Sequence, residues 1–314
     1  MDKKKLKVVF MGTPEFAVAS LKALVENDFN IVGVITAPDK PKGRGKQLGV
    51  SAVKEYALTQ SLNILQPSNL KDPVFLDELK ALDTQVQIIV AFRMLPEVVW
   101  NMPPMGSFNL HGSLLPDYRG AAPINWAIIN GEKKTGVTTF QLKHEIDTGN
   151  ILFQAEEPIS QEDTVGDVYI RLMQKGADLV VETAKALLNG EISLKPQNIV
   201  GQPKHAPKIY KEDCEINWNN SSTDIHNFIR GLSPYPAAWT KIINKTLKVF
   251  SVEKTEYELA IPIGHFHIRE KKELLIKTSD SVLKIKDLQF EGKRRMAADD
   301  FLRGFQVDNP NDFE

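Results

Sequence analysis

The sequence predicts a doubly wound α/β domain built on a mostly parallel sheet, followed by a small all-β barrel domain. Over residues 1–189, short apolar runs alternate with amphipathic helical patterns. After about residue 190 the helical periodicity ends, and closely spaced alternating runs follow. We therefore predict a first domain over residues 1–189, a linker over 190–208 and a second domain over 209–314.

The first domain opens with a strand, a helix and a second strand. The apolar run LKVVFMG at residues 6–12 predicts a buried strand. A helix is expected over residues 13–27, where Thr13 can cap the N-terminus and Pro14 suits the first turn. A second strand is expected over residues 30–38, and a loop rich in basic residues follows it.

The remaining elements continue this order and then change in character. Because strands separated by helices favour parallel pairing, we expect helices on both faces of the first sheet. The expected helices cover residues 51–61 and 164–190, and the expected strands cover 86–92, 106–112, 135–143, 237–242, 246–254, 265–270 and 273–290, the last divided by a turn at 278–281.

Composition narrows the class of protein. The chain has 314 residues, 42% of them hydrophobic, and a formal net charge of −1. Bulk charge therefore does not predict a nucleic-acid binder, and any such binding would need a local basic patch. The single cysteine, Cys214, cannot form an internal disulfide, which favours a reducing compartment. We find no signal peptide and no apolar run long enough to cross a membrane, and we expect a cytoplasmic monomer.

Three polar residues form the candidate catalytic set. Asn109 and His111 are two residues apart in a predicted strand, so their side chains share one face. Asp147 stands just before a Thr-Gly turn. An asparagine amide can donate to an oxyanion, a histidine can hold or transfer a proton, and an aspartate can orient the imidazole. Each of them could instead have a purely structural role, because spacing alone does not show that the three meet.

Other kinds of site have weaker support. Gly12, at the first strand–helix turn, is compatible with anion binding, but the sequence GTPEFA matches neither a dinucleotide fingerprint nor a P-loop. No cysteine–histidine cluster has zinc spacing, and no Gly-x-Ser-x-Gly motif is present. The sequence thus predicts neither a metal centre nor a covalent nucleophile.

A basic loop is the candidate surface for phosphates. Lys42, Arg44 and Lys46 alternate with Gly43 and Gly45. A solvated surface loop would explain this pattern. A flexible arm that binds a nucleic-acid backbone would explain it equally well, because guanidinium suits phosphates and glycines let the chain adapt.

Several motifs together resemble the methionyl-tRNA formyltransferase family. Those in the first domain are FMGTPEFA, PKGRGK, FNLHGSLLPDYRGAAP, TGVTTFQL and DTGNIL, and those in the second are GLSPYPAAWT and LQFEGKRRMAADDFLRG. The resemblance covers both domains in order. It implies a Rossmann-like formyltransferase domain, an OB-like tRNA-binding domain, and formyl transfer from 10-formyltetrahydrofolate to methionyl initiator tRNA without a metal.

The resemblance also assigns roles to single residues. It places the catalytic set on Asn109, His111 and Asp147, with Asn109 and His111 stabilising the oxyanion. It implies tRNA binding by Lys42, Arg44 and Lys46. The folate-binding residues that it implies are Ser113, Leu114, Leu115, Pro116, Ala91, Phe92 and Met94. One position departs from the family pattern, since Arg93 stands where the family usually has glycine.

Rival functions stay open on the sequence. A formyltransferase for a sugar-nucleotide or another small amine, or a formyltetrahydrofolate hydrolase, would carry the same catalytic set. Such an enzyme would not need the basic loop or the second domain. A non-catalytic RNA-binding module and a nicotinamide dehydrogenase are further alternatives. The polar set argues against the first of these, and the missing glycine fingerprint against the second.

Overall fold

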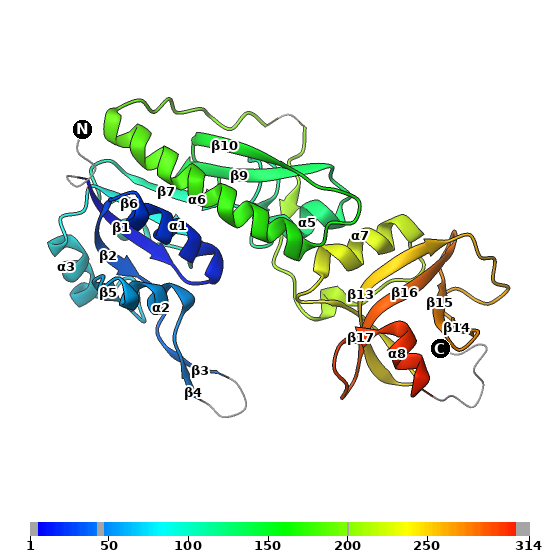
Figure 1. Ribbon diagram of the computed structural model, residues 1–314. Coiled ribbons are helices and arrows are strands. Elements are labelled where there is room, and N and C mark those ends of the chain that lie inside the picture. Colours follow the sequence, from blue (N-terminus) through cyan, green and yellow to red (C-terminus); the bar gives the residue numbers. More distant parts are fainter. Residues whose placement is uncertain (1–5, 43–46, 200, 306–314) are drawn as a thin grey trace. The chain divides into compact units, whose positions relative to one another are not determined.

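The computed structural model describes residues 6–42, 47–199 and 201–305 (Figure 1). The chain forms two compact units that alternate along the sequence. Unit 1 consists of Met1–Gly120, Thr135–Glu157 and Ile170–His205, and unit 2 of Ala121–Lys134, Pro158–Tyr169 and Ala206–Glu314. The domain boundaries expected from the sequence stay predictions.

Unit 1 is built on a seven-stranded sheet of order β10-β9-β7-β6-β1-β2-β5. The strands are β1 (Lys7–Gly12), β2 (Asn30–Ile35), β5 (Ile64–Leu65), β6 (Val86–Val90), β7 (Ser107–His111), β9 (Lys134–Gln141) and β10 (Ile151–Pro158). β1 pairs in parallel with β2 and with β6, whereas β9 runs antiparallel to β7. The prediction of a mostly parallel sheet is confirmed.

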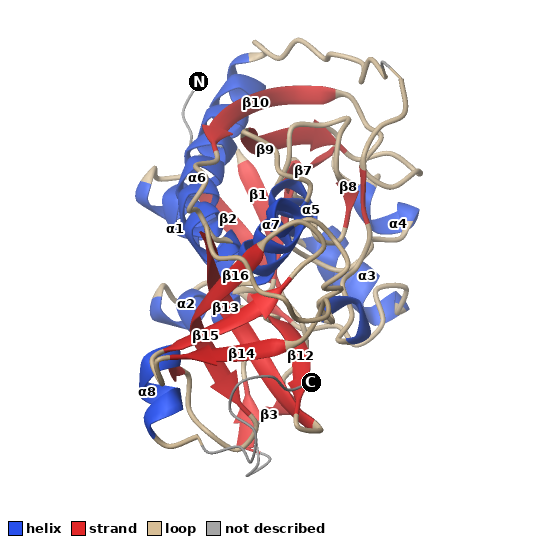
Figure 2. Cartoon of the chain, turned by 90° about the vertical axis from the view of Figure 1, so that its right-hand side faces the viewer, coloured by secondary structure: helices blue, strands red, loops and turns tan. Residues whose placement is uncertain are grey.

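Helices cover both faces of this sheet, as predicted (Figure 2). They are α1 (Glu15–Glu26), α2 (Ala52–Thr59), α3 (Pro73–Ala81), α4 (Glu97–Trp100) and α6 (Val165–Asn189). Phe75 and Leu79 of α3 and Val99 of α4 pack with Val9 and Ile89 of the sheet. On the other face Gly176 of α6 lies so close to Leu110 of β7 that an added Cβ would come within 2.7 Å of the leucine.

Two local expectations are corrected. Helix α1 begins at Glu15, and Pro14 rather than Thr13 occupies the N-cap position, without a side-chain cap. The basic segment is not a simple loop, because β3 (Lys40–Lys42) and β4 (Gln47–Gly49) pair antiparallel as a two-stranded ribbon. In Figure 1 this ribbon projects from the end of β2 away from the sheet of unit 1.

Unit 2 contains the predicted antiparallel strands. Its sheet has the order β12-β13-β16-β15-β14, with β17 paired to β16. The strands are β12 (Ala238–Ile242), β13 (Lys245–Thr255), β14 (Phe266–Arg269), β15 (Glu273–Lys277), β16 (Val282–Phe290) and β17 (Met296–Ala297). The turn expected at residues 278–281 joins β15 to β16.

Unit 2 also carries helices that the sequence analysis did not predict. They are α5 (Pro123–Ile129), α7 (Ser222–Leu232) and α8 (Ala298–Arg303), with the 3-10 helix η2 (Glu212–Cys214). In α7, Ile225, Ile229 and Leu232 recur at helical spacing and are buried. Ser221 accepts a hydrogen bond from the Asp224 amide, which is an N-cap that the sequence could have revealed.

A buried carboxylate joins the edge of the sheet in unit 1 to α6. Glu157 of β10 accepts from Arg171 Nε at 2.7 Å and lies 3.0 Å from Lys175 Nζ. Burial alone would raise the pKa of Glu157, but the hydrogen bonds from the two cations outweigh it and lower the pKa below its usual 4.5.

The contacts of Glu157 with Arg171 and Lys175 predict that the stability of the protein depends on pH. A lowered pKa contributes stability above the unfolded-state pKa, and that contribution is lost as the pH falls through the folded-state pKa. We expect Glu157→Gln to lower the free energy of unfolding by about 1–3 kcal/mol at pH 7. In urea titrations the difference from wild type should shrink below about pH 4.5. The exposed neighbour Glu156→Gln is the control, and an equal loss at pH 7 and pH 4 would contradict the prediction.

Among the helices in the described residues, none is both long enough and apolar enough to cross a membrane.

Candidate active site

The candidate site lies at the carboxyl end of β7 in unit 1. β7 carries Asn109 and His111 on one face, and Asn109 pairs with Ile89 of β6 in the parallel ladder. Because Ile89 belongs to the core beneath α3 and α4, both polar side chains lie on that face, opposite to α6. Open α/β sheets bind ligands beyond the carboxyl ends of their strands, where this site lies.

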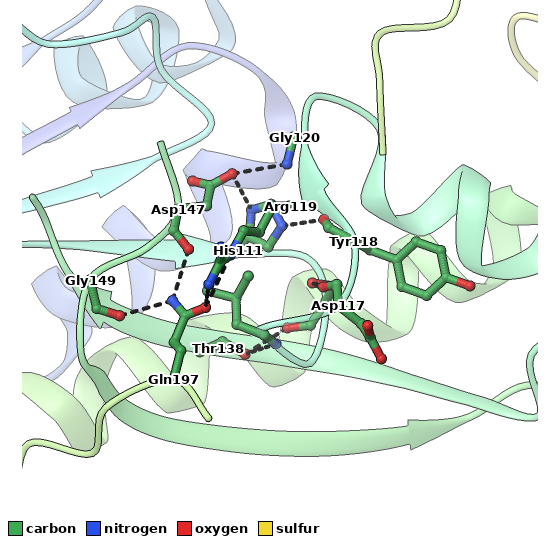
Figure 3. A network of polar contacts seen from close by, with 11 residues as sticks. His111, Asp117, Tyr118, Arg119, Gly120, Thr138, Asp147, Gly149 and Gln197 are labelled. Carbon is green, nitrogen blue, oxygen red and sulfur yellow. Dashed lines mark hydrogen bonds and ion pairs between the residues drawn. The ribbon is translucent and has the colours of Figure 1, made fainter. Parts of the chain in front are cut away.

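His111 and Asp147 lie together, as Figure 3 shows. The imidazole is 7% exposed, and its Nδ1 lies 3.8 Å from Asp147 Oδ2. Its Nε2 lies 2.8 Å from the carbonyl oxygen of Tyr118. A carbonyl can only accept, so Nε2 donates to it. Nδ1 is therefore the ring nitrogen left to exchange a proton, and it faces the carboxylate.

The backbone fixes Asp147 in place. Its Oδ2 accepts a hydrogen bond of 3.0 Å from the Gly120 amide. Gln197 donates through Nε2 to the carbonyl oxygens of Asp147, at 2.8 Å, and of Gly149, at 2.9 Å. The Oε1 of Gln197 accepts from Arg119. The carboxylate thus keeps its position beside the imidazole through contacts on both sides.

Three residues of this region adopt left-handed backbone conformations without being glycine. They are Tyr118 at φ 60°, Asp147 at φ 55° and Ala91 at φ 47°. Such conformations cost of order 1–3 kcal/mol each and concentrate at functional sites. Tyr118 is held by its amide, which donates to the Lys204 carbonyl at 2.6 Å. This conformation turns the Tyr118 carbonyl toward His111.

Asn109 is half-buried and stands one residue before Leu110. Within the part of the chain that the structure describes, no hydrogen bond joins its amide to His111 or Asp147. The predicted set therefore divides into a contacting pair and a third residue on the same face of the strand.

The segment Ser113–Pro116 is anchored from beneath. Ser113 is fully buried, and its hydroxyl donates to the Asp117 carbonyl at 2.6 Å. Leu115 is 3% exposed and packs with Phe140 and Ile151. The amide of Leu115 donates to Thr138 Oγ1, and its carbonyl accepts from Gln154. Leu114 and Pro116 are half-buried, so these two side chains are the more open part of the segment.

The other expected folate residues follow β6. Ala91 and Met94 are exposed, with Met94 73% exposed, and Phe92 is half-buried. Arg93 does not extend into solvent. Its guanidinium donates to the carbonyl oxygens of Pro67 and Ser68, and it lies 5.5 Å from the Phe92 ring.

Of the three basic residues expected to bind tRNA, only Lys42 lies among the described residues. Its backbone pairs with Gln47 in the ribbon. Arg44 and Lys46 lie outside the described residues.

Sequence reasoning missed four residues that build this site. Tyr118, Gln197, Thr138 and Gln154 supply the contacts that hold His111, Asp147 and the Ser113–Pro116 segment. No periodicity marks Gln197, since it lies 50 residues beyond Asp147 in a stretch expected to be a linker. Tyr118 acts through its carbonyl, so its residue type gives no signal.

Metal and thiol chemistry have no visible support in the residues that the structure describes. They contain no group of three or more histidines, cysteines or carboxylates that could hold a metal ion. Cys214 lies in unit 2, 1% exposed, and its thiol donates to the Tyr210 carbonyl at 3.2 Å. Burial, followed by the charge of Asp213, raises the pKa of this thiol, which disfavours the reactive thiolate.

Comparison with known proteins decides the family. The formyl transferase profile matches residues 4–184, and the formyl transferase C-terminal domain profile matches residues 208–306. A protein of Parabacteroides distasonis named methionyl-tRNA formyltransferase is 52% identical over 316 residues, which cover 98% of each chain. The chain belongs to the methionyl-tRNA formyltransferase family. A relative of the same name from Phocaeicola vulgatus is 52% identical over 324 residues and 100% of each chain.

Solved structures support the fold. The sugar 3N-formyl transferase WlaRD, crystallised with dTDP and 5-N-formyl-THF, is similar with a TM-score of 0.66 at 24% identity, over 92% of this chain and 99% of that one. HypX from Aquifex aeolicus in complex with tetrahydrofolic acid gives a TM-score of 0.63 at 18% identity, over 96% of this chain and 48% of that one. These similarities confirm the predicted Rossmann-like domain with an antiparallel second domain.

Proposed function

We propose that the protein transfers the formyl group of 10-formyltetrahydrofolate to the free amino group of methionyl initiator tRNA. The observation that carries this proposal is the pair formed by the buried His111 and the half-buried Asp147 at the carboxyl end of β7, in a chain that matches a named family member over 98% of both lengths. The reaction needs an oxyanion donor and a group that moves one proton, and the site offers both.

The first step is attack of the neutral amine on the formyl carbon. A C–N bond forms, and the carbonyl electron pair moves to the formyl oxygen. Asn109 and a protonated His111 donate to that oxygen, and each well-placed donor contributes about 3–4 kcal/mol in sites of this kind. Since Nε2 is engaged by Tyr118, we assign the donation to Nδ1.

The second step is collapse of the tetrahedral intermediate. The oxygen electrons re-form the carbonyl, the bond from carbon to the folate nitrogen breaks, and that nitrogen receives the proton lost by the amine. Asp147 takes the proton lost by the amine and His111 Nδ1 gives its proton to the folate nitrogen, directly or through water, after which Asp147 returns a proton to Nδ1. The chemistry forms no covalent bond to the protein. Much of the remaining rate would come from holding the two substrates in attack geometry.

We assign folate binding to the loops around this pair. Leu114 and Pro116 offer apolar surface to the pterin ring, while the buried Ser113 and Leu115 hold the segment from below. Ala91, Phe92 and Met94 would form the opposite wall. We further propose that the protein acts in the cytoplasm as a monomer.

We assign the tRNA contact to the basic segment of the β3/β4 ribbon and to the second domain. Replacing Arg44 with alanine is expected to raise KM for the charged tRNA several-fold, with little change in KM for the folate. Each lost phosphate contact lowers the slope of log affinity against log salt by about one. The measurement is tRNA affinity at several salt concentrations. Lys80→Ala, an exposed charge on α3, is the control. An unchanged slope of log affinity against log salt would show that Arg44 does not contact the tRNA and that the segment is an ordinary solvated surface.

The deciding experiment is formyl transfer itself. The protein is mixed with 10-formyltetrahydrofolate and methionyl initiator tRNA, and acid-stable formyl-methionine is measured. Parallel reactions contain free methionine, an amino sugar nucleotide, or no acceptor. We expect formylation of the charged tRNA alone. Formylation of the sugar, or folate hydrolysis without an acceptor, would be compatible with the catalytic role of His111 and Asp147 but would contradict the assignment of the tRNA as substrate.

A further inference from the structure

Arg93 connects two loops whose strands are not neighbours. β6 and β5 are separated in the sheet by β1 and β2, which corresponds to about 14 Å between strand axes. The guanidinium follows β6 and donates to the carbonyl oxygens of Pro67 and Ser68, which follow β5, at 3.0 Å for Ser68. Sheet pairing cannot make this connection, so Arg93 supplies it.

The guanidinium is engaged in an unusual way. No carboxylate pairs with it in the described part of the chain, and its Nε is buried without a hydrogen-bond partner. Holding a half-buried guanidinium on two carbonyl groups and one aromatic ring, without a carboxylate, is an expensive way to stabilise a fold. Its geometry instead suits one task, which is to fix two loop backbones relative to each other.

The connection continues from the β5 loop to the root of the basic ribbon. Gln66 donates through Nε2 to the Ala37 carbonyl at 2.7 Å and to Asp39 Oδ1 at 2.8 Å. Asp39 also pairs with Lys54 Nζ of α2 at 2.5 Å, with both side chains 18% exposed. Lys40, the next residue, begins β3. Asp39 is therefore held from two sides at the point where the ribbon leaves unit 1.

We propose that Arg93 and Gln66 form a brace that positions the root of the β3/β4 ribbon relative to the loop after β6. This inference rests on the proposed function, in which that loop binds the folate and the ribbon binds the tRNA. Arg93 and Gln66 are positioning residues and touch neither substrate. Arg93 holds the 91–95 loop to the carbonyl groups of residues 67–68, and the adjacent Gln66 holds Asp39 through its hydrogen bond to Oδ1.

The two variants have different expected kinetics. Arg93→Met removes the donors but keeps the length of the side chain, and should raise KM for both substrates by about tenfold, because small displacements of positioning groups cost this much or more. Gln66→Ala should raise KM for the tRNA only. In both variants kcat should change less than about threefold, since neither residue touches the reacting atoms. Arg93→Lys should recover part of the loss, and the exposed Lys71→Met is the matched control.

Hydrogen exchange provides a readout that does not depend on catalysis. In Arg93→Met we expect faster amide exchange both at residues 66–70 and at 37–40, and in Gln66→Ala at 37–40. The double variant should be no worse than the more severe single variant, because both act through one connection. If the wild type fails to formylate tRNA, the proposed function fails, and exchange still decides whether the brace exists.

Three results would overturn the brace. One is exchange at 37–40 that is unchanged in Arg93→Met. Another is strictly additive effects in the double variant. The third is a parallel loss of kcat and thermal stability with unchanged KM, which would make Arg93 a structural residue only.

Discussion

Replacing His111 with alanine is expected to lower the rate of formyl transfer by about 10²–10⁴-fold while tRNA affinity stays within severalfold of wild type. The loss has two sources, because the variant removes both the donor to the oxyanion and the group that moves the proton. The imidazole lies against Asp147, Tyr118 and the edge of the Phe140 ring, with ring centroids 6.4 Å apart. The measurement is single-turnover formylation alongside filter binding of the charged tRNA.

His111→Asn and His144→Ala separate chemistry from folding. Asparagine keeps a hydrogen-bonding amide at about the position of Nδ1, facing Asp147, but cannot carry a proton, so it should keep much of the thermal stability and still lose the rate. His144 is exposed in the connection between β9 and β10, which also carries Asp147, and its replacement should leave the rate unchanged. An equal loss of rate, tRNA binding and thermal stability in His111→Asn would assign His111 a structural role.

The sequence predicted those elements of unit 1 that leave a strong local pattern, whereas the short β5, α3 and α4 and the edge strand β10 were not predicted. The buried strands β1 and β6 are short apolar runs, and α6 repeats its apolar positions over 25 residues. Parallel pairing follows from their alternation with helices. The α7 helix was missed although Ile225, Ile229 and Leu232 recur at helical spacing, because it is only 11 residues long and its pattern is much shorter than that of α6.

The site was predictable only in part, for a physical reason. The side chains that do chemistry are recognisable by type and spacing, as His111 and Asp147 are. The groups that hold them are carbonyls and amides brought together by the fold, such as the Tyr118 carbonyl and the Gly120 amide. Any residue type can supply such a group, so the sequence carries no mark of it. Arg93 is the intermediate case, because its type stood out but its partners, two carbonyls, did not.

Gly149 is the position where a single methyl group is expected to do the most damage to the fold. The loop after β9 folds back there, and the Gln141 amide donates to the Asn150 carbonyl at 2.9 Å. A Cβ on Gly149 would lie 1.5 Å from the Gln141 carbonyl oxygen and 2.8 Å from the carbon of that group. Neither atom belongs to a side chain that can rotate away, so the backbone of the β9–β10 connection must move.

Gly149→Ala is therefore expected to lower the free energy of unfolding by about 3 kcal/mol or more, and to lower the rate as well. The rate falls because the Gly149 carbonyl accepts from Gln197, which also holds Asp147. Two glycines separate crowding from backbone strain. Gly304 has open space and an ordinary φ of −115°, so Gly304→Ala should be neutral. Gly190 has open space but a φ of 72°, so Gly190→Ala should cost only about 1–2 kcal/mol. Urea unfolding of the three variants should rank Gly149 first, and a Gly149 variant as stable as the Gly304 variant would show that the loop relaxes without cost.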